Sequence, residues 1–111
     1  MTTISTDNKV VTLINVFTVE PENQQRLVEM LIEATETTMK ALPGFVSANI
    51  HKSLDGVRVA NYAQWRSRKD FEAMLKNPDA TAHMKPIMGI AQFDAHLYEV
   101  VETTRISEAQ K

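Results

Sequence analysis

Two asparagines stand at strand positions where apolar residues are expected. Residues 10–19 and 57–65 alternate in the way that predicts β-strands, and Asn15 and Asn61 fall on an apolar face of each. Asparagine is depleted in strands, and a buried amide without a partner costs about 1–3 kcal/mol, so both positions call for a specific hydrogen-bonding role. Trp65 shares the face of Asn61 by the two-residue strand period. If these strands are neighbours, both amides and the indole meet in one cavity.

The chemistry of such a cavity follows from its neutral hydrogen-bonding groups. Two amides and an indole N–H can orient and polarise a flat oxygenated ring, but they do not cleave an ester or hold a divalent metal. His83, in a later helical segment, is the titratable candidate, and we expect it to point into the same cavity as an acid, a base or an axial ligand. The alternative is structural: asparagines that satisfy backbone groups, a tryptophan that fills the core and a histidine on the surface.

Composition excludes several other kinds of site. The chain of 111 residues has no cysteine, which removes disulfides, thiolate metal sites and a thiol nucleophile. Its 3 glycines are too scattered for a phosphate-binding loop. A net charge of −2 argues against a nucleic-acid partner. Neither GxSxG nor HExxH occurs, and His51 and His96 have no carboxylate at ligand spacing, so we expect no metal.

The order of predicted elements indicates the fold that positions these residues. A strand at 10–19 precedes a helix that continues to Leu42, and strands at 45–52 and 57–65 follow. A short helix capped by Ser67 is then broken at Asn77-Pro78, a further helical stretch covers about 80–90, and a last strand covers 97–101. This order predicts an α+β, ferredoxin-like βαββαβ fold with helices on one face of an antiparallel sheet. In that fold the first and third strands lie side by side, as the cavity requires.

The predicted domain organisation is one domain over residues 10–102, with a flexible N-terminal arm at 1–9 and a flexible tail at 103–111. The sheet face opposite the helices carries Val10, Ile14 and Val16, so we expect a homodimer packed through its sheets. No apolar run approaches the roughly 20 residues of a membrane span, and the N-terminus is polar. We therefore expect no membrane association and a cytoplasmic protein.

From about residue 10 to 101 the chain resembles the antibiotic biosynthesis monooxygenase family. The matching segments are a first strand with its asparagine, a turn after the long helix, a strand that runs into a helix and a closing strand: Leu13–Val19, Leu42–Phe45, Asn61–Ser67 and Leu97–Val101. The resemblance implies a dimeric α/β barrel. Family members that oxidise polyketide anthrones to quinones use neither a metal nor an organic cofactor. They carry an Asn-x-x-x-Trp motif on the third strand and an asparagine on the first, positions that Asn61, Trp65 and Asn15 match.

The same superfamily includes haem-degrading monooxygenases, which leave a second interpretation open. Those enzymes use an asparagine on the first strand, a tryptophan at the end of the third and a helical histidine that ligates iron, and Asn15, Trp65 and His83 match that set too. Asn61 favours the quinone-forming members, because the haem degraders carry an apolar or hydroxyl side chain there. A third interpretation is a non-catalytic dimeric domain that binds a small aromatic molecule.

The leading hypothesis is a cofactor-independent monooxygenase that oxidises an electron-rich aromatic of polyketide type, an anthrone, naphthol or hydroquinone, with O₂ to a quinone. In this hypothesis Asn15 and Asn61 stabilise the enolate oxygen, Trp65 stacks on or hydrogen-bonds to the ring, and His83 relays the proton. Its partners are the aromatic substrate, O₂ and a second copy of the chain.

Overall fold

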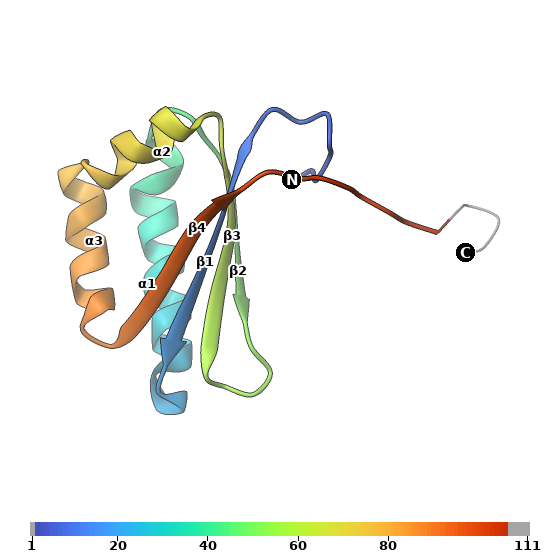
Figure 1. The fold of residues 1–111 in the computed structure, drawn as a ribbon. Helices are drawn as coiled ribbons and strands as arrows, with labels where there is room; N and C mark the ends of the chain where they lie inside the picture. The colour runs from blue at the N-terminus through green and yellow to red at the C-terminus, as the bar shows by residue number, and fades with distance from the viewer. Residues whose placement is uncertain (1, 107–111) are drawn as a thin grey trace.

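The computed structural model describes residues 2–106 and contains a four-stranded sheet whose helices all cover the same face (Figure 1). The strand order is β2-β3-β1-β4, and every neighbouring pair is antiparallel. The predicted ferredoxin-like α+β fold is thereby confirmed. In chain order the elements are β1 (Val11–Val19), a 3₁₀ turn (Pro21–Asn23), α1 (Gln24–Thr37), a second 3₁₀ turn (Met39–Ala41), β2 (Phe45–Lys52), β3 (Arg58–Trp65), α2 (Arg68–Leu75), α3 (Pro78–Met88) and β4 (Ala91–Tyr98).

β1 lies between β3 and β4, which explains why its sequence is apolar on both faces. Leu13, Phe17 and Val19 are buried on the face that the helices cover. The antiparallel register with β3 places Asn15 directly opposite Asn61. The predicted neighbourhood of the first and third strands is therefore confirmed, and with it the pairing of the two asparagines on one sheet face.

β4 differs from the prediction. Sequence analysis placed the last strand at Leu97–Val101, whereas β4 runs from Ala91 to Tyr98 and pairs with β1 over its full length. β4 is an edge strand, and its outward positions Gln92, Asp94 and His96 are all exposed and polar. Apolar residues alternate with these polar ones at Ala91, Phe93, Ala95 and Leu97, so the two-residue period of a half-buried strand is present in the sequence and begins well before the predicted start at Leu97.

The helix boundaries follow local chemistry. α1 ends at Thr37, before the predicted Leu42, and a 3₁₀ turn carries the chain toward Pro43. Ser67 caps α2 as expected, since its Oγ accepts from the Asp70 N–H at 3.1 Å. Asn77 caps α3 in the same way, accepting from two backbone N–H groups. No helix within residues 2–106 is long and apolar enough to cross a bilayer.

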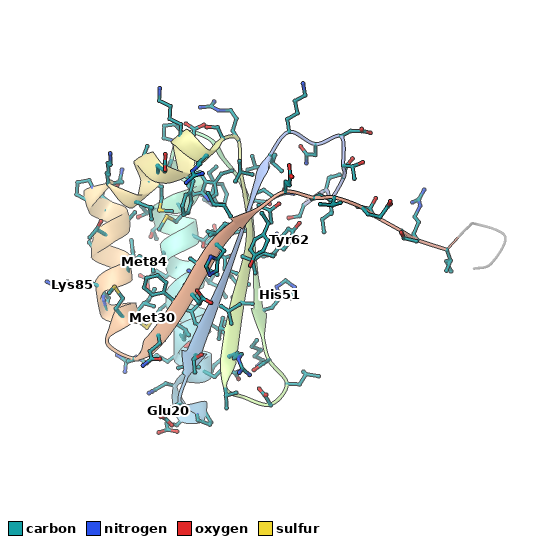
Figure 2. All side chains as sticks on the ribbon, viewed as in Figure 1. Glu20, Met30, His51, Tyr62, Met84 and Lys85 are labelled. Carbon is teal, nitrogen blue, oxygen red and sulfur yellow. The ribbon has the colours of Figure 1, made fainter. Side chains whose placement is uncertain are left out.

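The helix-free face of the sheet carries polar and aromatic side chains, including His51 and Tyr62 (Figure 2). The N-terminal arm is bonded to this face: Gln64 Nε2 donates to the Thr3 carbonyl at 2.8 Å, and Asn49 Nδ2 donates to Thr2 Oγ1 at 2.6 Å. Residues 103–106 are exposed and have neither helix nor strand. The rest of the predicted flexible tail, residues 107–111, and residue 1 of the arm lie outside the described residues.

The space between the sheet and the helices has two ends. At the packed end, six buried side chains form one cluster: Phe17, Val19, Leu27, Leu31, Val59 and Ile87. At the hollow end, the buried cluster is only Leu13, Ala63 and Trp65, surrounded by partly buried side chains. The side chains of the packed end fill the space between sheet and helices, and a cavity begins where this filling ends.

Candidate functional site

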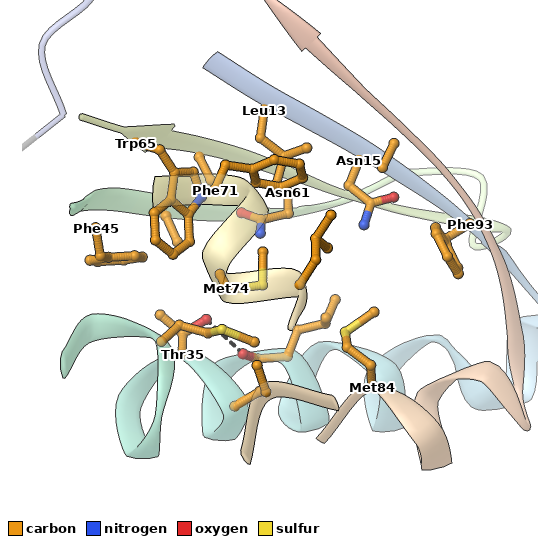
Figure 3. Close-up of a pocket in the computed structure, with 18 of the residues that line it drawn as sticks. Leu13, Asn15, Thr35, Phe45, Asn61, Trp65, Phe71, Met74, Met84 and Phe93 are labelled. Atoms are coloured by element: carbon orange, nitrogen blue, oxygen red, sulfur yellow. Dashed lines mark hydrogen bonds between the residues drawn. The ribbon is translucent and has the colours of Figure 1, made fainter. Parts of the chain in front are cut away.

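A cavity of about 230 Å³ lies between the sheet and the three helices at the hollow end (Figure 3). Its walls are mainly leucine, phenylalanine, methionine and alanine side chains. Leu75, Met88 and Phe93 line the cavity and are also 58%, 59% and 45% exposed, so the cavity reaches the surface beside them. A mostly apolar pocket with few polar groups is the usual form of a small-molecule site, although this one is smaller than most.

Asn15 and Asn61 supply the polar groups of the sheet wall. They face each other across β1 and β3, and their amide nitrogens point into the cavity (Figure 3). Both Oδ1 atoms are buried and have no hydrogen-bond partner among residues 2–106. Each unpaired buried oxygen costs about 1–3 kcal/mol. The fold thus bears an energetic cost at two amides that line the same cavity.

Trp65 closes the cavity beside the amides, where it is 2% exposed. Its ring makes edge-on contacts with Phe45 at 5.6 Å and Phe71 at 6.3 Å between ring centroids. These contacts fix the indole plane as part of the wall. The three strand residues predicted to meet, Asn15, Asn61 and Trp65, are therefore brought together.

His83 does not belong to this group, so the prediction that it points into the cavity is wrong. Its Nε2 lies 3.2 Å from Thr37 Oγ1 on α1, and other α3 residues line the cavity instead: Ala80, Thr81, Met84 and Met88. Successive residues of an α-helix are rotated by about 100°, and the four α3 residues that line the cavity share one side of the helix. His83 is rotated roughly 100° away from the middle of that side.

The position of His83 also bears on the haem-binding alternative. That interpretation required an imidazole inside the cavity, and the cavity has none among the residues that line it. Within residues 2–106, no three side chains of histidine, cysteine, aspartate or glutamate come together as a metal site would require. The residues present therefore do not fit a haem held by His83.

The cavity wall contains no aspartate, glutamate, histidine, lysine, arginine, tyrosine or cysteine among the described residues. Besides the asparagines and Trp65, its polar side chains are Thr35 on α1 and Thr81 on α3. The sequence interpretation assigned no role to either threonine, nor to the four methionines of the wall, Met39, Met74, Met84 and Met88. Helical periodicity can place a side chain on the buried side of a helix, but no sequence signal distinguishes a cavity wall from a filled core.

A polar cluster positions α2 over the cavity. Asp70 accepts from Arg66 Nε at 2.9 Å and from Ser67 Oγ at 2.9 Å. The hydrogen bond from Arg66, followed by that from Ser67, lowers the pKa of Asp70 below its usual value of 3.8. Gly44, with φ of +83°, packs so closely on Asp70 that a Cβ there would run into its side chain. Its carbonyl accepts from the Arg66 N–H at 2.7 Å, which ties the β2 entrance to this cluster.

Comparison with known proteins gives consistent matches. Residues 10–86 match the family model described as antibiotic biosynthesis monooxygenase. Tetracenomycin-F1 monooxygenase of Streptomyces glaucescens is 49% identical over 83 residues, which cover 75% of this chain and 74% of that protein.

Solved structures share the fold. SnoaB, a cofactor-independent oxygenase from Streptomyces nogalater, has 21% identity and a TM-score of 0.74, covering 86% of this chain and 97% of its own. A Streptomyces coelicolor monooxygenase in complex with the ligand nanaomycin D has 23% identity and a TM-score of 0.76, covering 93% and 99%.

Proposed function

The chain belongs to the antibiotic biosynthesis monooxygenase family, and we propose that it oxidises an electron-rich polyketide-type aromatic with O₂ to a quinone, without a metal or an organic cofactor. An anthrone, a naphthol or a hydroquinone is the substrate class. The 49% identical relative is named for a monooxygenase reaction on tetracenomycin F1, which supports this class.

The paired amides of Asn15 and Asn61 are the observation that carries the proposal. Two N–H donors on neighbouring strands of the same cavity wall suit an oxygen that gains negative charge, as a phenol or anthrone oxygen does on deprotonation. Apolar walls exclude water and strengthen both hydrogen bonds, while the fixed strands spare the cost of reorientation. Trp65 forms a flat wall against which the substrate ring can stack.

The reaction balances with O₂ as the sole oxidant. Loss of a proton, from the methylene carbon of an anthrone or from the hydroxyl of a naphthol, gives an enolate or phenolate, whose oxygen the two amides bind. This anion passes one electron to O₂, and the resulting carbon radical and superoxide combine in a C–O bond. A proton converts the peroxide to a hydroperoxide. Loss of water breaks the O–O bond and leaves the second carbonyl, so one oxygen atom enters the product and the other leaves in water.

Among residues 2–106, no side-chain base lines the cavity to accept the first proton. We propose that the substrate's own acidity supplies the enolate. Two hydrogen bonds to the conjugate base lower the pKa of the bound substrate, and the proton passes to solvent where the cavity reaches the surface beside Leu75, Met88 and Phe93. His83, which sequence analysis assigned to proton relay, has no part in this scheme because it faces Thr37.

Oxygen uptake by metal-stripped, flavin-free protein with dithranol as substrate tests the proposal. Replacing one oxyanion donor typically costs ~10²–10³ in turnover, and we expect that loss for Asn61→Ala with little change in thermal unfolding. Asn49→Ala is the matched control, because Asn49 is a strand asparagine that bonds to Thr2 and Tyr62 on the other face.

Three results would contradict the proposal. Dependence of wild-type turnover on an added metal or flavin would refute the cofactor-free reaction. Full turnover by Asn61→Ala would remove the amide from the mechanism. Binding of aromatic compounds without any oxygen uptake would support the non-catalytic binding domain instead.

We further propose that the protein is a homodimer joined through the helix-free faces of its sheets. Ile14 and Val16 lie half-buried in the middle of this face, and Tyr98 at its edge is 48% exposed. Sedimentation should give twice the chain mass of 12.5 kDa, and Val16→Lys should give a monomer or aggregate. A stable wild-type monomer at micromolar concentration would refute the dimer.

A further inference from the structure

The helix side of the cavity carries polar groups of a different kind from the sheet side. Thr35 lines the cavity from α1, across from Asn15 and Asn61 (Figure 3). Its hydroxyl donates to the Leu31 carbonyl at 2.8 Å. A hydroxyl has one proton and two lone pairs, so with that proton committed Thr35 can only accept a hydrogen bond from a ligand.

Thr81 repeats this arrangement on α3. It also lines the cavity, and its hydroxyl donates to the Asn77 carbonyl at 3.0 Å. The helix wall therefore offers acceptors only, whereas the sheet wall offers the amide N–H donors of Asn15 and Asn61. A ligand that satisfies both walls has an acceptor oxygen at one edge of its ring system and a hydroxyl donor at the opposite edge.

We propose that Thr35 is a specificity-determining residue that selects aromatic substrates with a free hydroxyl on the edge remote from the oxygen bound by the asparagines. This inference rests on the proposed function, since it assumes that the amides bind the substrate oxygen. Thr35 carries the selection because it is partly buried, whereas Thr81 is exposed to competing water. Every other side chain on the helix side is apolar, so a misplaced hydroxyl finds no partner there.

Two naphthols separate the edges. 1-Naphthol has one hydroxyl, and 1,5-dihydroxynaphthalene has a second one on the opposite edge. Binding is measured by calorimetry under anaerobic conditions, so that turnover does not enter. We expect the wild type to bind the diol more tightly. Thr35→Val, which keeps the shape but loses the acceptor, should weaken diol binding about 3–10-fold and leave 1-naphthol binding unchanged.

The controls isolate the hydroxyl. Thr35→Ser retains the acceptor and should retain the preference for the diol. Thr37→Val removes the same kind of hydroxyl-to-carbonyl bond from the same helix at an exposed position outside the cavity, and should change neither affinity. Thermal unfolding verifies that each variant is folded, and Thr35→Ala replaces Thr35→Val if the latter is not.

Equal weakening of both ligands in Thr35→Val, or no weakening of the diol, would overturn the inference. So would a wild type that binds both naphthols equally. None of these results would contradict the proposed function, which is tested separately by oxygen uptake with dithranol and by the Asn61→Ala variant.

Discussion

The packed end and the hollow end of this small domain use the same sheet and the same helices for opposite purposes. At the packed end, Leu27 and Val59 are 0% exposed and Ile87 is 1% exposed, so the sheet and helices interlock. At the hollow end, Trp65 is only 2% exposed, but the side chains packed against it, among them Met74, Phe71 and Phe45, are themselves only partly buried. The polar groups of the hollow end include amide oxygens without partners, which the packed end does not show among residues 2–106.

The hollow end gives up stability that a filled core would provide. At roughly 24 cal/mol per Å³, a dry cavity of about 230 Å³ costs at most about 5–6 kcal/mol. That is comparable with the whole free energy of unfolding of a typical domain. The packed end therefore stabilises the fold, and this allows the hollow end to stay open for a ligand.

The largest expected effect comes from making the hollow end resemble the packed end. Asn15→Leu removes a buried amide whose oxygen has no partner and adds apolar volume to the cavity. We expect turnover of dithranol to fall ~10²–10³-fold. The free energy of unfolding should rise by about 1–3 kcal/mol. Oxygen uptake and urea denaturation measure the two changes, and a variant that loses stability together with activity would contradict this contrast.

Truncation at each end tests the difference in packing directly. Leu27→Ala at the packed end should lower the free energy of unfolding by about 2–5 kcal/mol, because its neighbours cannot collapse into the gap. Met74→Ala enlarges a cavity that already exists, so we expect a loss of no more than about 1–2 kcal/mol.

Activity should respond in the reverse order. Below its melting temperature Leu27→Ala should retain wild-type turnover, whereas Met74→Ala should raise the KM for the aromatic substrate. Equal destabilisation by the two substitutions would show that the hollow end is as tightly packed as the other.

The same contrast explains what the sequence could predict. Strand alternation fixes which face a side chain takes, so the meeting of Asn15, Asn61 and Trp65 followed once β1 and β3 were recognised as neighbours. In a helix, side chains point in all directions around the axis, and tertiary packing sets how the helix is rotated about that axis. His83 was misplaced for that reason, although it lies beside Met84, which does line the cavity.

β4 did carry a local signal, because apolar and polar residues alternate from Ala91 to Leu97 as in a half-buried strand, and the predicted bounds of the last strand missed it. Thr35 has no such signal: it is an ordinary helix residue in sequence, and only the tertiary structure shows that it lines the same cavity as the two amides. Whether space between elements is filled or empty depends on all the surrounding side chains at once.

The hollow end is held partly by the polar cluster around Asp70, on which Gly44 packs, and a substitution of Gly44 tests that cluster. Gly44→Ala places a side chain at φ of +83° and drives a Cβ into Asp70. We expect a loss of about 1–3 kcal/mol in the free energy of unfolding. Gly56→Ala is the matched control, since Gly56 has φ of +84° but its nearest neighbour lies 4.0 Å from the added Cβ.

The difference between the two glycine variants measures the clash with Asp70 alone, because both pay the same conformational cost. Gly44→Ala should also weaken 1-naphthol binding by displacing α2, and Gly56→Ala should not. Identical unfolding energies for the two variants would mean that Asp70 moves aside freely and that the cluster does not position α2.

The smallest expected effect is the dependence of the same cluster on pH. The pKa of Asp70 is lowered by its hydrogen bonds from Arg66 and Ser67, so the folded protein favours the carboxylate more than the unfolded chain does. The stabilisation is present above the unfolded value, near 3.8, and is lost as the pH falls through the lower folded value. Asp70→Asn lacks this titration. The variant's deficit in unfolding free energy relative to wild type should therefore be largest at neutral pH and shrink as the solution is acidified below about 4. Because Arg66 is largely exposed, added salt should reduce this deficit at neutral pH. Urea denaturation of both proteins across this range makes the measurement, and a deficit that stays constant with pH would show that Asp70 supports α2 through its shape and not through its charge.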